Sequence, residues 1–326
     1  MDLSTTYMGL RLPNPFIVSS CKLTGNITDI RKCLDSGAGA IVLKSLFEEQ
    51  LIANSSKLMD QDPKYFWYPE AVEYINAHSK EYGVNQYLDL ISAAKKHAVV
   101  PIIASINCVT ASTWPQFAKS LVNAGADGIE LNIAIMPTQA MKSSDEIEKI
   151  YVDIVRAVRE NVDVPIAVKL GPLFTNIIEM ISNLCHAGMN GAVLFNRFYR
   201  PDIDLEYEIV KAPNFLSAPE EMGQPLRLIS LLSPKVKCSI AGNTGIHDAE
   251  GAIKMLLVGA SAVQVCSTLY KNGIGYLDTM IHEMGKWMES KGYNSIDDFK
   301  GNIIKYQENA LAFERLQFLK SVLSDY

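Results

Sequence analysis

The sequence lacks several features by which whole classes of protein are recognised. Its six cysteines are scattered and none forms a Cys-x-x-Cys pair, which argues against zinc and iron–sulfur sites. No run of about 18 apolar residues occurs that would span a membrane. The first residues have neither the positive region nor the apolar segment of a signal peptide. We therefore expect reduced cysteines, no membrane partner and a cytoplasmic location.

Charge of one sign is not concentrated anywhere in the chain. There are 30 Lys and Arg residues against 36 Asp and Glu, for a net charge of −6, and no basic run is present. This balance argues against a nucleic-acid partner. The 326 residues, 48% of them hydrophobic, can bury a large core. Because no linker or low-complexity tract interrupts them, we predict a single domain over residues 1–326.

What the sequence does contain is a short apolar run that recurs, rich in Val and Ile and continuously apolar. Such runs predict strands buried on both faces, and hence a parallel sheet. The eight runs are PFIVSS (15–20), AIVLKS (40–45), PIIASI (101–106), GIELNI (128–133), PIAVKL (165–170), GAVLF (191–195), CSIAG (238–242) and AVQVC (262–266).

Helical patterns lie between most of these runs, for example at 114–125, 145–162 and 247–260. Eight βα units predict a TIM (β/α)8 barrel, with extra helices in the region 274–325. A doubly wound sheet is the competing interpretation, but no G-x-G-x-x-G turn follows the first strand. Two long connections, 46–100 and 196–237, are of the kind that cover a site or mediate assembly.

Polar residues gather where the predicted strands end, which is where barrel enzymes place their active sites. Lys44 and Lys169 follow apolar runs directly. A buried lysine is costly unless an anion or another acceptor meets it, although each alone also fits a surface residue with a buried stem. The other polar strand-end residues are Ser19, Ser20, Ser45, Ser105, Asn107, Asn132, Asn196, Arg197, Asn243, Ser267 and Thr268.

The last two predicted strands are followed by sequences that suit an anion. "AGNTGI" offers small residues and free backbone N–H groups, and "VCSTLYKNG" begins another helix. Barrels commonly bind phosphate at these two loops. A phosphate site combined with two lysines favours flavin mononucleotide (FMN), with a lysine beside the charge of the reduced ring. A sugar-phosphate substrate remains the alternative.

The chain resembles the class 1 dihydroorotate dehydrogenases and the related flavin domain of dihydropyrimidine dehydrogenase. The segments that carry the resemblance run in order along the chain: MGLRLPNPFIVSS, GAGAIVLKS, IIASINC, ADGIELNI, PIAVKL, AGNTGIHDAEGAIKMLLVGASAVQVCSTLYKNG and KGYNSIDDFKG. The resemblance implies an FMN oxidoreductase of pyrimidine biosynthesis, acting on a CH–CH bond as a homodimer.

The resemblance also implies roles for individual residues. Lys44 is the catalytic candidate, since it would contact the flavin and face the substrate. Cofactor contacts are implied for Ser19, Ser20, Lys44, Ser45, Asn132, Lys169, Gly242, Asn243, Thr244, Gly245, Ser267 and Thr268, with Cys266 in the same loop. Substrate contacts are implied for Lys44 and Asn132, and for Asn196 by its match to a substrate-binding asparagine.

The chain departs from the family at the part of the site that holds the pyrimidine. The family reads roughly N-L-S-C-P-N after the fourth strand, and the cysteine is the base. Here Ile135 takes that position, and Pro137 replaces an asparagine that holds the substrate. Arg197 stands where the family has a small hydroxyl residue, and it would bind an acidic group on the substrate.

Loss of a positioned base typically costs about 10²–10⁴-fold in rate. Candidate replacements are Cys21, Cys108, Thr138, Lys142, Ser143 and Ser144. Three interpretations follow: an oxidoreductase acting on dihydroorotate or a similar reduced ring, an FMN oxidoreductase with a different substrate, or a flavin- or phosphate-binding barrel without redox activity. The electron acceptor is either a small molecule or a separate electron-transfer partner.

Overall fold

The computed structural model describes residues 1–47, 84–108, 114–133, 135, 143–197, 201–211, 216–305 and 313. Eight parallel strands form its centre, and all eight coincide with the predicted apolar runs. They are β3 (Phe16–Val18), β4 (Ala40–Val42), β6 (Ile102–Cys108), β7 (Gly128–Ile133), β8 (Ile166–Leu170), β9 (Gly191–Leu194), β12 (Ser239–Gly242) and β13 (Ala262–Val265).

The sheet closes on itself. Each strand pairs with its neighbour in parallel, β13 returns to β3 through Val263 and Phe16, and β4 pairs with β6 through Ile41 and Ile102. A short strand, β5 (Leu46–Phe47), adds to β6 beyond the end of β4. Closure confirms the predicted TIM barrel and rules out the doubly wound sheet, because an open sheet would leave two unpaired edges.

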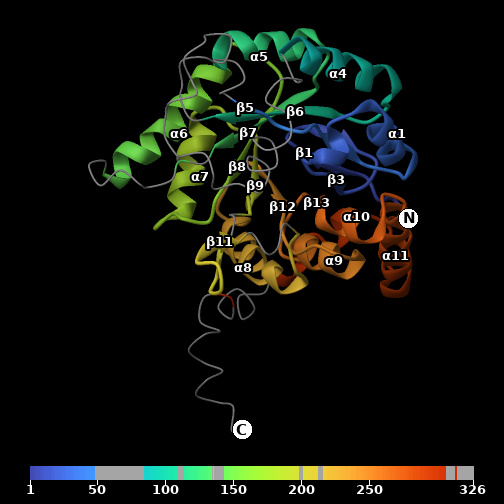
Figure 1. Ribbon diagram of the computed structural model, residues 1–326. Coiled ribbons are helices and arrows are strands. Elements are labelled where there is room, and N and C mark those ends of the chain that lie inside the picture. Colours follow the sequence, from blue (N-terminus) through green and yellow to red (C-terminus); the bar gives the residue numbers. More distant parts are fainter. Residues whose placement is uncertain are drawn as a thin grey trace, which may run out of the picture.

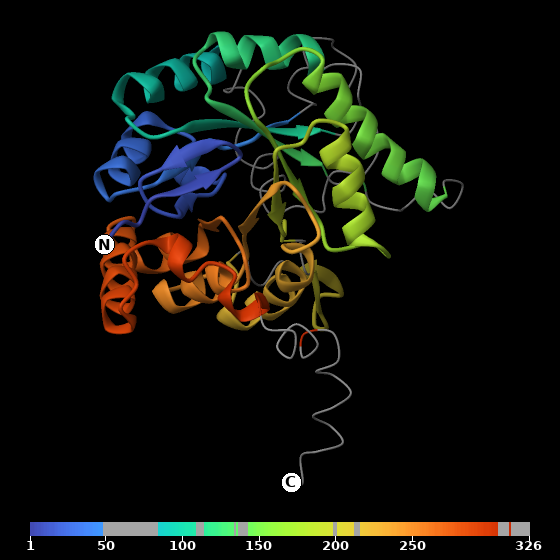
Figure 2. The ribbon, with the colours of Figure 1, turned by 180° about the vertical axis from the view of Figure 1, so that it is seen from behind.

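Helices surround the closed sheet (Figures 1 and 2). The predicted helices at 114–125, 145–162 and 247–260 are confirmed as α5, α6 and α9, and α11 and α12 lie in the predicted C-terminal region. The helices are α1 (Ile27–Asp35), α4 (Val84–His97), α5 (Trp114–Asn123), α6 (Ser144–Arg159), α7 (Ile177–His186), α8 (Gly223–Leu232), α9 (Ala249–Leu257), α10 (Ser267–Asn272), α11 (Tyr276–Lys291) and α12 (Asn302–Lys305), with 3-10 turns at Lys22–Thr24, Pro219–Met222 and Ile296–Asp298.

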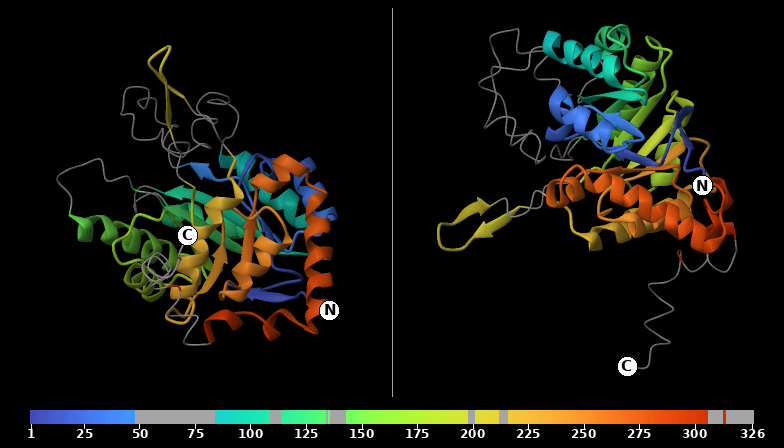
Figure 3. Two further views of the ribbon diagram at one scale, coloured as in Figure 1. Left: turned by 90° about the horizontal axis from the view of Figure 1, so that it is seen from below. Right: turned by 90° about the vertical axis from the view of Figure 1, so that its right-hand side faces the viewer.

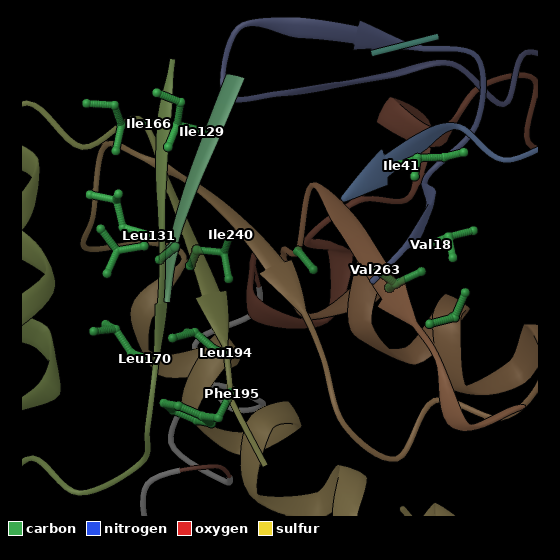
Figure 4. Packing of buried hydrophobic residues seen from close by; sticks show 14 of the residues in the cluster. Val18, Ile41, Ile129, Leu131, Ile166, Leu170, Leu194, Phe195, Ile240 and Val263 are labelled. Atoms are coloured by element: carbon green, nitrogen blue, oxygen red, sulfur yellow. The ribbon is translucent and has the colours of Figure 1, made fainter. Parts of the chain in front are cut away.

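Side chains of the strands alternate between two apolar cores. One core lies between the strands and the helices, where Ile129, Leu131 and Ile166 stand on the outer face of the sheet (Figure 4). The second core lies inside the barrel and includes Val42 and Val193. Burial on both faces explains why the strands read as continuous apolar runs rather than as alternating ones.

An antiparallel hairpin that the sequence pattern did not reveal closes one end of the barrel. It consists of β1 (Thr5–Tyr7) and β2 (Leu10–Leu12), and Tyr7, Met8 and Leu12 pack into the inner core. The Met8 N–H donates to Ser239 Oγ over 3.1 Å, at the start of β12. The hairpin therefore covers the amino-terminal ends of the strands, and the carboxyl-terminal ends are left for the site.

The two long connections have different outcomes. Most of 46–100 lies outside the described residues, apart from β5 and α4. The connection 196–237 contains an antiparallel hairpin, β10 (Asp202–Asp204) and β11 (Ile209–Lys211), which stands away from the barrel (yellow in Figure 3). Its apolar side chains Leu205, Tyr207 and Val210 are exposed. None of the described helices combines the length and apolarity needed to cross a bilayer.

Candidate active site

A cavity of about 200 Å³ lies at the carboxyl-terminal ends of the strands. Most of the predicted site residues meet there, although they come from segments far apart in the sequence. The predicted residues that line it are Ser19, Ser20, Lys169, Asn196, Arg197, Asn243, Thr244, Gly245 and Ser267. The structure thus brings these polar strand-end residues to one cavity, while their roles remain proposals.

A chain of hydrogen bonds runs from Lys169 on this cavity into the barrel. Lys169 Nζ donates to Ser19 Oγ over 3.2 Å, and Ser19 Oγ donates to Gln264 Oε1 over 2.9 Å. Gln264 Nε2 donates in turn to Glu130 Oε2 over 2.5 Å. All four side chains are at most 5% exposed. Burial raises the pKa of Glu130, while the Lys169 charge and the Gln264 hydrogen bond act against that rise.

A second chain is made of hydroxyl groups. Ser20 Oγ lies 3.0 Å from Ser45 Oγ, which lies 2.8 Å from Ser105 Oγ. Tyr87 of α4 fixes the inner end, because its hydroxyl donates to the Ser105 carbonyl and accepts from the Ser105 N–H. Ser45 itself does not line the cavity. It supports Ser20, which does.

Lys44 has a different setting from Lys169. It is half-buried, its N–H donates to the Thr24 carbonyl over 3.2 Å, and its aliphatic stem passes beside Gly25. A Cβ on Gly25 would lie only 3.1 Å from Lys44 Cδ. Lys44 is not among the residues that line the cavity, so the structure places one predicted lysine there and not both.

Three asparagines occupy the ends of the central strands. Asn196 Nδ2 donates to Asn132 Oδ1 over 2.9 Å, which links Asn132 to the cavity through Asn196. Asn107 lies beside Asn132 in the sheet register, and Asn132 lies beside Lys169. Within the described residues, the buried Asn107 Nδ2 has no hydrogen-bond partner. An unpaired buried donor costs about 1–3 kcal/mol, so an acceptor on a bound molecule would stabilise this layer.

The loop after β12 is shaped by backbone geometry. Asn243 Nδ2 and Thr244 Oγ1 both donate to the Phe195 carbonyl, over 2.8 and 3.0 Å. Thr244 and Gly245 have φ angles of 73° and 78°, in the left-handed region. A Cβ on Gly245 would lie 2.3 Å from the backbone nitrogen of Met222, so glycine is required there. Gly242, which precedes this loop, is buried against Met255 and does not line the cavity.

Ser217, from the long connection after β9, links the loop after β12 to the loop after β13. Its N–H donates to Ser267 Oγ over 2.9 Å, and its carbonyl accepts from Lys271 Nζ over 2.9 Å. Ser217 Oγ lies 3.2 Å from His247 Nε2 and accepts from the Gly245 N–H over 3.4 Å. Burial, and next the Lys271 charge, lower the pKa of His247. Sequence reasoning missed Ser217, His247 and Lys271, and a serine in a long loop gives no signal that would find it.

The helices after these loops refine the anion prediction. Asp248 caps α9, and its carboxylate accepts from the Gly251 N–H over 2.8 Å. An acidic cap disfavours an anion at that helix end. Thr268 is fully buried and donates to the His247 carbonyl over 2.7 Å, so it holds one loop against the other. An anion would therefore be met by the loop 243–246 and Ser267 rather than by the start of α9.

Arg197 lines the cavity and forms an ion pair with Glu221. Its Nε donates to Glu221 Oε2 over 2.9 Å, and the two side chains are 16% and 10% exposed. Glu221 Oε1 also accepts from the Ala218 N–H over 2.9 Å, which anchors the carboxylate to the segment that carries Ser217. The pair thus fixes where the guanidinium of Arg197 stands.

Ile135, which the resemblance aligns with the family's base, has an apolar side chain. Ile135 packs against the outer core, and its N–H donates to the Tyr151 hydroxyl over 3.0 Å. Ser143 caps α6 by accepting from the Glu146 N–H over 3.2 Å, and Ser144 begins that helix. Cys21 lines the cavity. Pro137, Thr138 and Lys142 and the side chain of Cys108 lie outside the described residues.

The sequence contained two signals that the prediction did not use. Glu130 and Gln264 are polar residues inside otherwise apolar strands, and both are at most 1% exposed. A buried polar group in a strand must find a partner, so it marks a hydrogen-bonded layer. Cys21 and Tyr270 also line the cavity, as does Cys266. Burial, and next the charge of Cys21, raise the pKa of Tyr270.

The fold and the site together define a barrel protein with a cavity of cationic and amide donors at the carboxyl ends of its strands, an arrangement typical of barrel enzymes. The family model described as Dihydroorotate dehydrogenase matches residues 2–288. The chain therefore belongs to the dihydroorotate dehydrogenase family.

Similar proteins include dehydrogenases for two ring substrates. The chain is 30% identical to the dihydroorotate dehydrogenase B (NAD(+)) catalytic subunit of Thermoplasma volcanium, over 93% of this chain and 99% of that one. It is 25% identical to the NAD-dependent dihydropyrimidine dehydrogenase subunit PreA of Escherichia coli K12, over 92% of this chain and 76% of PreA. It is 22% identical to the chloroplastic dihydropyrimidine dehydrogenase (NADP(+)) of Arabidopsis thaliana, over 94% and 78%.

Proposed function

We propose that this protein is an FMN-dependent oxidoreductase that removes hydride from a CH–CH bond of a reduced, acidic ring related to the dihydropyrimidines. The observation that carries the proposal is the cavity itself, where a buried lysine, amide side chains and an anion-suited loop meet. FMN, when bound, would supply the hydride acceptor. Family membership supports the proposal, because the similar proteins are dehydrogenases acting on such rings.

The residues present suit FMN. Loop 243–246 and Ser267 would hold its phosphate, with Lys271 close by on Ser217. Lys169 would stand beside the ring and stabilise the negative charge that develops on reduction. Asn107 Nδ2, which has no partner among the residues that the structure describes, lies in the same layer of the barrel and suits a ring that is rich in acceptors. Ser19, Ser20, Asn132 and, through its position after β4, Lys44 complete the proposed contacts.

The substrate end of the site differs from that of a dihydroorotate enzyme. Arg197 and Asn196 would bind an acidic group and a carbonyl of the substrate. Ile135 offers no proton acceptor, so the chemistry would need a substrate whose proton is already acidic or a base from elsewhere. A substrate other than dihydroorotate therefore fits best.

A second candidate is slow dihydroorotate oxidation with Cys21 as the replacement base. Among the replacement bases considered from the sequence, Cys21 is the one within the described residues that lines the cavity. A thiol can take a proton from carbon once it is ionised. This candidate predicts that Cys21→Ala abolishes reduction by dihydroorotate while FMN stays bound.

A separate electron-transfer partner also belongs to the proposal. Two of the similar proteins are named as subunits, one of them as a catalytic subunit. The homodimer expected from the sequence remains a prediction, as does the single domain over 1–326.

The proposal is tested by the visible spectrum of the purified protein, taken anaerobically before and after addition of L-dihydroorotate, dihydrouracil and dihydrothymine. A yellow protein that is bleached by dithionite but not by dihydroorotate would support an intact flavin site with a different substrate. Bleaching by dihydrouracil or dihydrothymine, which lack an acidic group, would support the ring chemistry but contradict the acidic group assigned to Arg197. Bleaching by dihydroorotate would favour the second candidate. A colourless protein that takes up no added FMN would overturn both, and would favour a barrel without redox activity.

A further inference from the structure

The barrel interior beneath the cavity contains a carboxylate that the proposed function does not use. Glu130 comes from the middle of β7, is 1% exposed, and points into a layer between the apolar inner core and the cavity. A buried carboxylate is costly unless it is paired and hydrogen-bonded. Its partners should therefore show what the carboxylate is for.

When Glu130 is ionised, it sets the polarity of the hydrogen bonds of this layer. A carboxylate accepts but does not donate, so it orients the Gln264 amide with Nε2 toward itself. Gln264 Oε1 then faces Ser19, whose hydroxyl must donate to it. The Ser19 lone pairs are left to accept from Lys169 Nζ. Reversing the amide would bring an N–H group to face Ser19, in competition with Lys169.

The charge of Lys169 also acts on Glu130. The Lys169 charge lowers the cost of ionising the buried Glu130 carboxyl. Two buried tyrosines also face Glu130: Tyr7 from the hairpin below and Tyr87 from α4. Burial raises the pKa of each tyrosine, and the Glu130 charge raises it further. Both tyrosines therefore stay neutral and add no negative charge beside Lys169. Lys169 is thus the cation that Glu130 balances.

We propose that Glu130 is a positioning residue for Lys169, which sets through Gln264 and Ser19 both the direction of the lysine N–H bonds and the net charge of the cavity floor. The inference deepens the proposed function, since it identifies what holds the lysine that would face FMN. It concerns residues of this chain, however, and is measurable without a cofactor.

Two substitutions separate charge from orientation. Glu130→Gln removes the charge but keeps an oxygen that accepts from Gln264, whereas Glu130→Met removes both. Glu289→Gln, an exposed acid on α11, is the matched control. Lys286, exposed on the same helix, is the internal reference for lysine reactivity.

The first measurement uses the protein without added FMN. Mass spectrometry follows acetylation of Lys169 by acetic anhydride as a function of pH, relative to Lys286. Without the Glu130 charge the attraction that holds Lys169 Nζ in place is lost, so both variants should react about tenfold faster than the unsubstituted protein at pH 8.5. The second measurement is FMN affinity by fluorescence quenching. Glu130→Met should weaken binding about tenfold, while Glu130→Gln restores most of it.

Unchanged Lys169 reactivity in a folded Glu130→Gln protein would overturn the inference, and so would equal loss of FMN affinity in both variants. If Glu130→Met does not fold, the acetylation profile of Glu130→Gln decides the question. If the unsubstituted protein binds no FMN, the proposed function fails, but the acetylation profile still tests the link between Glu130 and Lys169.

Discussion

Arg197 and Glu221 form an ion pair at the edge of the cavity, with Nε and Oε2 2.9 Å apart and both side chains largely buried. Glu221 is itself tied to the backbone of Ala218, next to Ser217. Arg197 is therefore held by a second charged residue on the same long connection. That arrangement suits an arginine that receives a ligand, because its position is fixed before binding.

Replacing the carboxylate of this pair tests the role of Arg197. Glu221→Gln should raise the KM for an acidic ring substrate about tenfold and change kcat little, since a fixed guanidinium contributes chiefly to binding. Steady-state kinetics on the substrate found by anaerobic bleaching would measure this. Lys286→Met, on the outer surface of α11, serves as the control. A lower kcat with an unchanged KM would contradict the role assigned to Arg197.

Restoring the base tests the interpretation of the loop after β7. If the second candidate, dihydroorotate oxidation, is correct, Ile135→Cys should speed reduction of bound FMN by dihydroorotate about 100-fold, within the range that a positioned base contributes. Stopped-flow absorbance under anaerobic conditions measures the rate, and Ile135→Val controls for loss of packing. No gain with cysteine would show that the substrate pocket differs in more than the missing base, so that dihydroorotate is not bound productively.

Gly245 should tolerate no side chain, because two costs coincide there. A residue with a Cβ would adopt φ of 78° and would also meet the Met222 backbone at 2.3 Å. Gly245→Ala should destabilise the fold by more than about 2 kcal/mol and abolish FMN binding. Gly292 also has positive φ, 74°, but a Cβ there meets nothing within 4 Å. Gly292→Ala should cost about 1 kcal/mol and leave FMN binding intact. Urea unfolding and FMN titration compare the two, and equal effects would refute the steric argument.

Glu130 predicts a pH dependence of stability. Because burial raises its pKa, the folded state holds this proton to a higher pH than the unfolded state does. Folding stability is therefore lost as the pH rises from the unfolded pKa, about 4.3, through the higher folded pKa. Glu130→Gln cannot ionise, so its stability relative to the unsubstituted protein should increase over that range and then level off. Urea unfolding of both proteins at pH 4.5 to 8 measures the difference in unfolding free energy. A difference that does not change with pH would mean that Glu130 has the same pKa in the folded and unfolded states.

The sequence predicted most of the fold because both faces of every barrel strand are buried. All eight apolar runs became strands, and the helices between them followed from their amphipathic periodicity. The hairpins β1–β2 and β10–β11 were not predicted. Their short strands include polar or exposed residues and so form no continuous apolar run, and the first hairpin is held by contacts with distant strands.

For the site, the sequence by itself determined which polar residues stand at strand ends, and closure of the barrel brings such ends together wherever they fall in the chain. It also determined that Ile135 cannot act as a base. The tertiary structure decided the rest: that Lys169 lines the cavity and Lys44 does not, that Ser217 joins the two loops, and that Glu221 holds Arg197. These relationships depend on loop paths and side-chain directions, which arise from packing between residues far apart in sequence and leave no local pattern along the chain.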